Sequence, residues 1–250
     1  MKISKTPSAP CWASLATTDT AAAALFYEAL FGWRTEPGTD AGGPAVFALD
    51  ATGPQVAGVG PVRMPQQPAA WLPYFQSSGV DAVTARVGGN GGRVVSGPSG
   101  VGDRGRLAVC QDPAGAAFGL WEPLEHAGFQ TVNVPGSFTW FELLTRDPGG
   151  AVDFYQSVLG WGTRRHDGCL DWTVADEPFG GMVDMSAGDV PQGPSQWNLY
   201  VAVTDPDATA ARCTEAGGQT VVEPRDTPAG RFALLTDPQG AAFSVLRAAS

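Results

Sequence analysis

The sequence has 250 residues, of which 43% are hydrophobic, and a formal net charge of −10 at pH 7. Its length suits one large or two ordinary domains, and its composition is globular rather than disordered. An acidic chain without a Lys/Arg cluster excludes nucleic acid as an expected partner, while the lack of a long apolar run or secretory leader excludes a membrane association and favours the cytoplasm.

The opening elements alternate between strand and helix patterns. Alternating residues from Trp12 to Thr17 predict a strand. Thr18 or Asp19 offers an N-cap, and the apolar spacing that follows predicts a helix that ends at Gly32. Segments bounded by Gly and Pro then predict three strands, at residues 32–36, 45–49 and 56–62.

The same order of elements begins again further along the chain. We predict a strand at residues 71–76, a helix at 80–89, and strands near Val94, at 106–111 and at 116–121. An Asp-Pro-x-Gly turn at residues 112–115 joins the last two strands as a hairpin. The first half therefore contains two βαβββ units.

The second half repeats the first. Asp19 recurs as Asp147, 128 positions later, and the Asp-Pro-x-Gly turn recurs at residues 237–240. Other matched pairs are Tyr27 with Tyr155, Trp33 with Trp161, and Trp71 with Trp197. This register predicts an α+β fold of four βαβββ units, with one module at residues 1–124, a linker at 125–136 and a second module at 137–250.

These motifs resemble a known family. The strand that ends in Asp, the FYxxxxGW helix end, the Gly-Gly turn and the DPxGxxF hairpin are similar to the vicinal-oxygen-chelate superfamily. That superfamily includes glyoxalase I, extradiol dioxygenases and bleomycin-binding proteins, and the closest resemblance is to duplicated bacterial proteins labelled hydroxylases. The resemblance implies two glyoxalase-like open β-barrel modules, each with a small-molecule cavity.

The resemblance also implies where a metal ion would bind. Metal-using members hold the ion at three inward positions of a module, on its first, fifth and last strands. Those positions fall on Trp12, Leu72 and Gly119 in the first half, and on Trp140, Asn198 and Ser244 in the second. None is His, Glu or Asp, so we expect no metal. No GxGxxG motif or P-loop is present either, and we expect no cofactor.

Glu142 is the predicted catalytic residue. It follows Trp140 by two positions on the same predicted strand, so both side chains lie on one face. A carboxylate on an apolar face can take or give a proton. The alternative is a structural carboxylate paired with backbone or Arg. The first half has Ser14 at the matching position.

The predicted ligand-binding residues lie on the inward strands and are mostly aromatic. They are Trp12, Ser14, Trp71, Tyr74, Trp140, Trp197, Asn198, Tyr200 and Ser244. Aromatic walls suit a planar or conjugated ligand, although the tryptophans could equally fill the core. Asp19 and Asp147 are interpreted as helix caps, and Asp112 and Asp237 as turn residues.

Two functions fit this set of residues. We favour a metal-independent enzyme that converts a small aromatic or conjugated metabolite by cyclisation, isomerisation or elimination in secondary metabolism. The alternative is a non-catalytic protein that sequesters a drug or metabolite for self-resistance, as bleomycin-binding proteins do. In either case the partner is a small molecule, and the chain is a monomer or homodimer.

Overall fold

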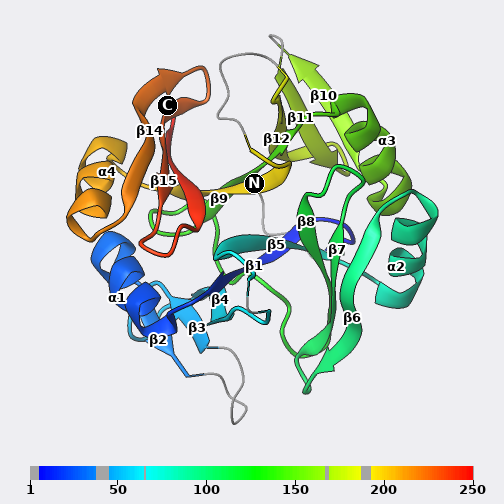
Figure 1. Ribbon diagram of the computed structural model, residues 1–250, viewed down its shortest axis with the longest axis horizontal. Coiled ribbons are helices and arrows are strands. Elements are labelled where there is room, and N and C mark those ends of the chain that lie inside the picture. Colours follow the sequence, from blue (N-terminus) through cyan, green and yellow to red (C-terminus); the bar gives the residue numbers. More distant parts are fainter. Residues whose placement is uncertain (1–5, 38–44, 65, 167–168, 187–192, 250) are drawn as a thin grey trace. The chain divides into compact units, whose positions relative to one another are not determined.

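The computed structural model describes residues 6–37, 45–64, 66–166, 169–186 and 193–249. The first half contains two βαβββ units (Figure 1): β1 (Pro10–Thr17), α1 (Thr20–Phe31), β2 (Arg34–Glu36), β3 (Ala45–Ala48) and β4 (Gln55–Pro61), then β5 (Ala70–Gln76), α2 (Val80–Gly89), β6 (Arg93–Val101), β7 (Gly105–Gln111) and β8 (Ala117–Pro123). The predicted order of elements in this half is confirmed.

The second half repeats this order. Its elements are β9 (Phe138–Thr145), α3 (Pro148–Leu159), β10 (Gly162–His166), β11 (Cys169–Val174) and β12 (Glu177–Asp184), then β13 (Gln196–Ala202), α4 (Pro206–Glu215), β14 (Gln219–Thr227), β15 (Gly230–Thr236) and β16 (Ala242–Ala248). Four βαβββ units therefore follow one another, as the duplication predicts.

Each half forms one eight-stranded sheet. The strand order is β2-β3-β4-β1-β5-β8-β7-β6 in the first sheet and β10-β11-β12-β9-β13-β16-β15-β14 in the second. Strands β1 and β4 run parallel, as do β5 and β8, whereas the hairpins at the sheet edges are antiparallel. The equal order in both halves confirms the predicted α+β architecture of two glyoxalase-like modules.

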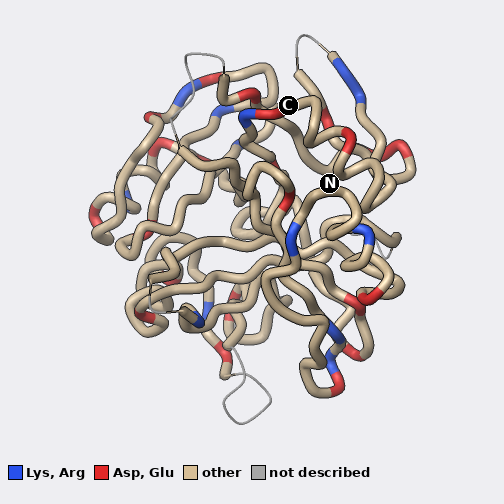
Figure 2. Tube along the Cα trace, turned by 45° about the vertical axis from the view of Figure 1, so that its right-hand side comes forward, with Lys and Arg blue, Asp and Glu red and all other residues tan. Residues whose placement is uncertain are grey.

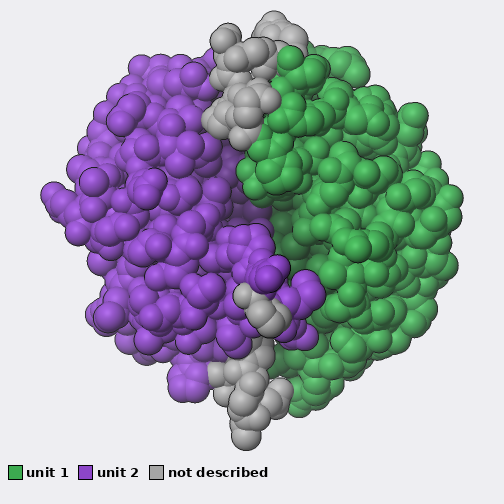
Figure 3. Space-filling view, in the orientation of Figure 1, with its two compact units in different colours: residues 1–12, 72–128, 140–197 green, residues 13–71, 129–139, 198–250 purple. Residues whose placement is uncertain are grey.

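The chain also divides into two compact units, which combine parts of both halves (Figure 3). Unit 1 consists of Met1–Trp12, Leu72–Gly128 and Trp140–Trp197, and unit 2 of Ala13–Trp71, Phe129–Thr139 and Asn198–Ser250. In unit 1, α2 packs against α3, and in unit 2, α1 packs against α4 (Figure 1). The predicted bounds of the modules and linker stay a prediction. Each compact unit combines segments of both halves, so the units do not test where one module ends and the next begins.

The long helices begin and end where the sequence indicates. Asp19 Oδ1 accepts a hydrogen bond from the Ala22 N–H at 2.9 Å, and Asp147 caps α3 in the same way. Gly32 ends α1 at φ 76°. Glycine reaches this left-handed conformation without the steric cost of a Cβ. The interpretation of both aspartates as caps is confirmed.

Charged residues are dispersed along the chain (Figure 2). Equivalent ion pairs recur in the two units, where Arg106 contacts Asp81 at 2.7 Å and Arg231 contacts Asp207 at 2.6 Å. Both acids lie in the first turn of a helix.

Among the described residues, no helix combines the length and the apolar composition that crossing a bilayer requires.

Candidate functional site

Trp140 and Glu142 reach the same point in unit 1. Both lie on β9, which pairs in parallel with β12 so that Glu142 is opposite Gly181. A Cβ added at Gly181 would lie 3.3 Å from Trp140 Nε1 and 3.6 Å from Glu142 Oε1. The alternation of the strand therefore brings the indole and the carboxylate together, as predicted, and the missing side chain of Gly181 leaves room for both. Glu142 itself is half-buried.

The matching tryptophan of the first half is covered. Trp12 is 9% exposed, and its ring meets His126 edge-on with 4.5 Å between ring centroids. The His126 carbonyl accepts a hydrogen bond from Trp121 Nε1 at 2.9 Å. Burial lowers the pKa of the His126 imidazole, which therefore favours the neutral form. Sequence reasoning placed His126 in a linker and missed this contact, because nothing local connects residues 12 and 126.

A tyrosine ring occupies the place of a side chain at Gly119. A Cβ built on Gly119 would collide with the Cδ1 and Cε1 atoms of Tyr74, which lies opposite it on the neighbouring parallel strand. Tyr74 is 9% exposed. In the first half, the Tyr74 ring therefore occupies the space that the side chain of the third metal ligand would need.

The second half has a polar pair at the corresponding positions. Asn198 Nδ2 donates a hydrogen bond to Ser244 Oγ at 2.8 Å, and both residues are buried in unit 2. Among the described residues, no donor reaches Asn198 Oδ1. Tyr200 lies opposite Ser244, with its ring centroid 6.3 Å from that of Phe232. Three predicted ligand-binding residues, Asn198, Tyr200 and Ser244, therefore share one sheet face.

Two stretches match one family profile. The profile of the glyoxalase-like domain covers residues 12–121 and again residues 140–246. The chain belongs to the glyoxalase-like family of the vicinal-oxygen-chelate superfamily. This assignment agrees with the repeated βαβββ order and with the two sheets of equal topology.

Relatives match this glyoxalase-like chain along nearly its whole length. CFP32 of Mycobacterium bovis, which carries the name glyoxylase, is 40% identical over 250 residues, covering 96% of this chain and 95% of the relative. The anthracycline biosynthesis protein DnrV of Streptomyces peucetius is 38% identical over 258 residues, covering 96% and 93%.

Solved structures show the same fold at low sequence identity. The Mn(II)-bound glyoxalase from Novosphingobium aromaticivorans has a TM-score of 0.66 at 18% identity, covering 98% of this chain and 84% of its own. The 2,3-dioxygenase LapB from Pseudomonas sp. KL28 also has a TM-score of 0.66, at 12% identity, covering 97% and 93%.

The residues at the family's metal positions do not fit a divalent ion. Trp12 and Leu72 offer no suitable donor, and the space beside Gly119 is taken by Tyr74. In the second half Trp140 is no ligand, so the only side-chain oxygens at these positions are the neutral Asn198 Oδ1 and Ser244 Oγ, which are too weak a pair to hold a divalent ion without a carboxylate or imidazole. Within the described ranges, His, Cys, Asp and Glu form no group of three that could hold a metal. We therefore derive no step through a metal ion.

Trp71 belongs to a buried polar chain in unit 2. Trp71 Nε1 donates to the Tyr27 hydroxyl at 2.9 Å, and this hydroxyl donates to Asp237 Oδ2 at 3.1 Å. Asp237 Oδ1 accepts the Ala241 N–H at 2.8 Å and so also holds the hairpin turn. We call these three residues the unit 2 relay. Its hydroxyl comes from the first half and its carboxylate from the second.

Unit 1 contains the reciprocal chain. Trp197 Nε1 donates to the Tyr155 hydroxyl at 3.0 Å, which donates to Asp112 Oδ2 at 3.2 Å, while Asp112 Oδ1 accepts the Ala116 N–H. In this unit 1 relay the hydroxyl comes from the second half and the carboxylate from the first. Desolvation raises the pKa of the Asp112 carboxyl and raises the pKa of the Tyr155 hydroxyl well above its usual range.

The relays change the interpretation of four residues. Trp71 and Trp197 are 6% and 5% exposed and donate their indole N–H groups to tyrosines, so these contacts favour core packing over ligand binding. Asp112 and Asp237 do hold turns, as predicted, but the second carboxylate oxygen of each accepts a hydrogen bond from a tyrosine hydroxyl of the other half of the sequence. The recurrence of Tyr, Trp and Asp in both halves was the signal that could have revealed this network.

The remaining predicted residue, Ser14, is half-buried on β1 and lies opposite Gly58 of β4.

An open hollow of about 540 Å³ lies between α4 and β14 in unit 2 and is lined by Asp207, Ala210, Ala211, Thr214, Gly218, Gln219, Thr220, Glu223 and Pro224. None of the predicted site residues lines it, so we do not place the ligand there.

The relays lead to a stability prediction. Tyr155→Phe removes the hydroxyl that joins Trp197 to Asp112 and leaves two buried polar groups without this partner. We expect the free energy of unfolding to fall by about 1–3 kcal/mol, measured by urea denaturation. Tyr27→Phe is the matched change in unit 2 and should have a similar cost. An unchanged denaturation midpoint in both variants would contradict a structural role for the relays.

The raised pKa of Asp112 predicts a pH dependence. Its native state holds the carboxyl proton more tightly than the unfolded chain, in which the pKa is about 3.9. The stabilisation that Asp112 contributes is therefore present below that value and is lost as the pH rises through the raised native pKa. Relative to Asp112→Asn, the wild type should become less stable over this window in urea titrations. A wild type that becomes more stable relative to Asp112→Asn as the pH rises would rule this out.

Proposed function

We propose that this chain binds a planar aromatic or conjugated metabolite and converts it by proton transfer through Glu142, without a divalent metal. The observation that carries the proposal is the convergence of Glu142 Oε1 and Trp140 Nε1 over Gly181. A carboxylate beside an indole suits a flat ligand that must be held and deprotonated. The first half has Ser14 in place of this carboxylate.

The chemistry needs no electron transfer. Glu142 as a general base would take a proton from a carbon or hydroxyl of the ligand and return it at another position, which is the balance of an isomerisation or cyclisation. In an elimination the same proton would leave with the departing group. The relative named as an anthracycline biosynthesis protein supports an aromatic metabolite as the ligand and secondary metabolism as the setting.

The catalytic proposal is tested by Glu142→Gln. We expect turnover of a hydroxylated polycyclic aromatic substrate to fall by about 10²–10⁴-fold, the usual contribution of general acid–base catalysis. Affinity, followed by quenching of tryptophan fluorescence, should change little because the amide keeps the shape of the carboxylate. Glu215→Gln, which changes an exposed residue of α4, serves as the control. Tight binding with no turnover in the wild type would favour sequestration instead.

Independence from metal is tested by chelation. Dialysis against EDTA should leave both ligand affinity and turnover unchanged, because the residues at the family's metal positions offer no suitable donor set. Elemental analysis of the purified protein should show Zn, Fe, Mn and Ni well below one equivalent per chain. Stoichiometric metal, or activity that is lost on dialysis and restored by a divalent ion, would overturn this part of the proposal.

A further inference from the structure

Asn198 carries a buried hydrogen-bond acceptor that no described residue satisfies. Its Nδ2 is bonded to Ser244 Oγ at 2.8 Å, yet Oδ1 has no donor among the described residues, although the side chain is only 6% exposed. A buried acceptor without a partner costs stability, so a donor from outside the chain, such as a water or a ligand hydroxyl, would offset that cost. The first half has Leu72 and Gly119 at these positions, which shows that the fold does not require this polar pair.

The same face of unit 2 continues as an aromatic surface. Strand pairing places Tyr200 opposite Ser244, and Phe232 opposite Leu246, on the face that carries Asn198. Ala233 and Leu235 point to the opposite face and are fully buried, whereas Phe232 is half-buried. This surface therefore offers a ring-sized apolar contact on the same sheet face as Asn198 Oδ1.

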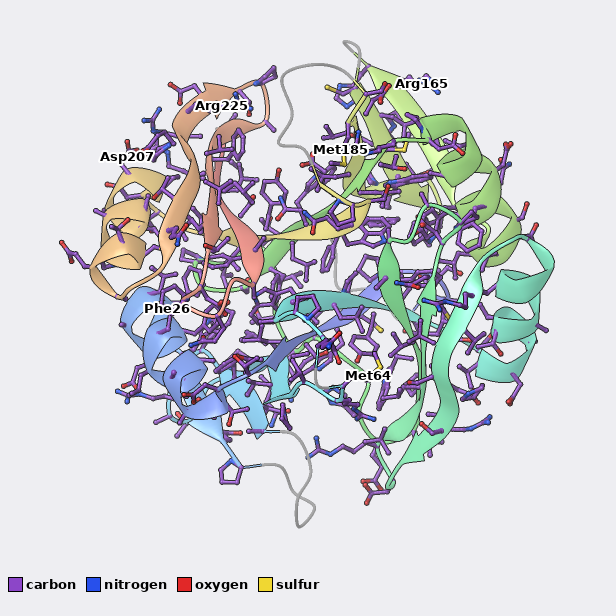
Figure 4. The ribbon with its side chains drawn as sticks, viewed as in Figure 1. Phe26, Met64, Arg165, Met185, Asp207 and Arg225 are labelled. Carbon is purple, nitrogen blue, oxygen red and sulfur yellow. The ribbon has the colours of Figure 1, made fainter. Side chains whose placement is uncertain are left out.

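An arginine borders this surface. The Arg225 guanidinium lies over the Phe232 ring at 5.1 Å from its centroid and is exposed on β14, away from α1 and Phe26 (Figure 4). Among the described residues, no carboxylate forms an ion pair with Arg225, whereas Arg231 contacts Asp207 and Asp226. The position that matches Arg225 in the first half is Ser99, which lies opposite Leu107 as Arg225 lies opposite Phe232.

We propose that this face binds a hydroxylated aryl acid, whose hydroxyl donates to Asn198 Oδ1 and whose carboxylate pairs with Arg225. Across the sheet, β13, which carries Asn198, and β15, which carries Phe232, are two spacings apart, about 10 Å; along the strands the register offsets Asn198 from Phe232 by four residues, about 13 Å. That span suits several fused rings rather than a single ring. The proposal rests on the proposed function for the aromatic nature of the ligand and adds its two polar groups.

Three related probes test the two contacts. The parent probe is a hydroxyanthraquinone carboxylic acid with its hydroxyl and carboxylate on opposite outer rings, and the others are its O-methyl ether and its methyl ester. We expect the wild type to bind the parent at least tenfold more tightly than either derivative, measured by calorimetry. Equal affinity for all three probes would overturn the proposal without any variant.

Two variants assign the contacts to residues. Asn198→Leu copies the first-half residue and should abolish the preference for hydroxyl over ether, while the preference for acid over ester remains. Arg225→Ser copies Ser99 and should do the reverse. Asn198→Ser is a smaller change that tests the same contact if the leucine variant does not fold. If both Asn198 variants still prefer the hydroxyl to the ether as the wild type does, Asn198 does not make the hydroxyl contact. If Arg225→Ser still prefers the acid to the ester, Arg225 does not make the carboxylate contact.

The outcomes also separate this inference from the proposed function. If Glu142→Gln abolishes turnover while the wild type does not distinguish the three probes, the catalytic role stands and the ligand contacts fall. If the probes are distinguished as expected and Glu142→Gln retains full turnover, the contacts stand and the catalytic role falls. A protein that binds none of the probes would overturn the ligand contacts, whereas the catalytic role is decided by Glu142→Gln alone.

Discussion

A tyrosine hydroxyl held between an indole N–H and an aspartate carboxylate joins the two halves of the sequence in each compact unit. Tyr155 reaches Asp112 in unit 1, and Tyr27 reaches Asp237 in unit 2, so that each half supplies the carboxylate for the other. Each carboxylate also fixes its own hairpin turn through backbone N–H groups. Because all these groups are buried, the relays hold only when helix, strand and hairpin are placed correctly together.

The two halves differ at positions that do not belong to the relays. In the first half, Tyr74 covers Gly119, and His126 packs on Trp12. In the second half, an Asn198–Ser244 pair takes the corresponding positions, and no residue in the described ranges donates to Asn198 Oδ1. At these positions the repeated fold therefore has a filled face in the first half and a polar face in the second.

Fold and chemistry are separable in this family. The likeness to a Mn(II)-bound glyoxalase and to a dioxygenase, at 18% and 12% identity, shows the fold alone. Function depends on the side chains that the fold positions at its site. Here the metal positions hold no His, Asp or Glu. The chemistry we propose therefore comes from a carboxylate and an aromatic surface.

Local patterns in the sequence determined the elements and their repetition. Helix 80–89 has the bounds that its pattern predicted, and Asp19 caps the first helix, because spacing and capping involve neighbouring residues. The period of a strand likewise placed Glu142 and Trp140 on one face. These features depend on contacts within a few positions, or on register between two similar halves, both of which can be read directly from the chain.

Only the tertiary structure decided which side chains are partners. Tyr27 and Asp237 are 210 positions apart, so no local pattern links them, and the aromatic spacing of Trp71 was equally consistent with a ligand wall and with the core. The combination of both halves in each compact unit was hidden for the same reason. Sequence periodicity reports which face a residue occupies, whereas the atom it bonds to depends on how distant segments pack.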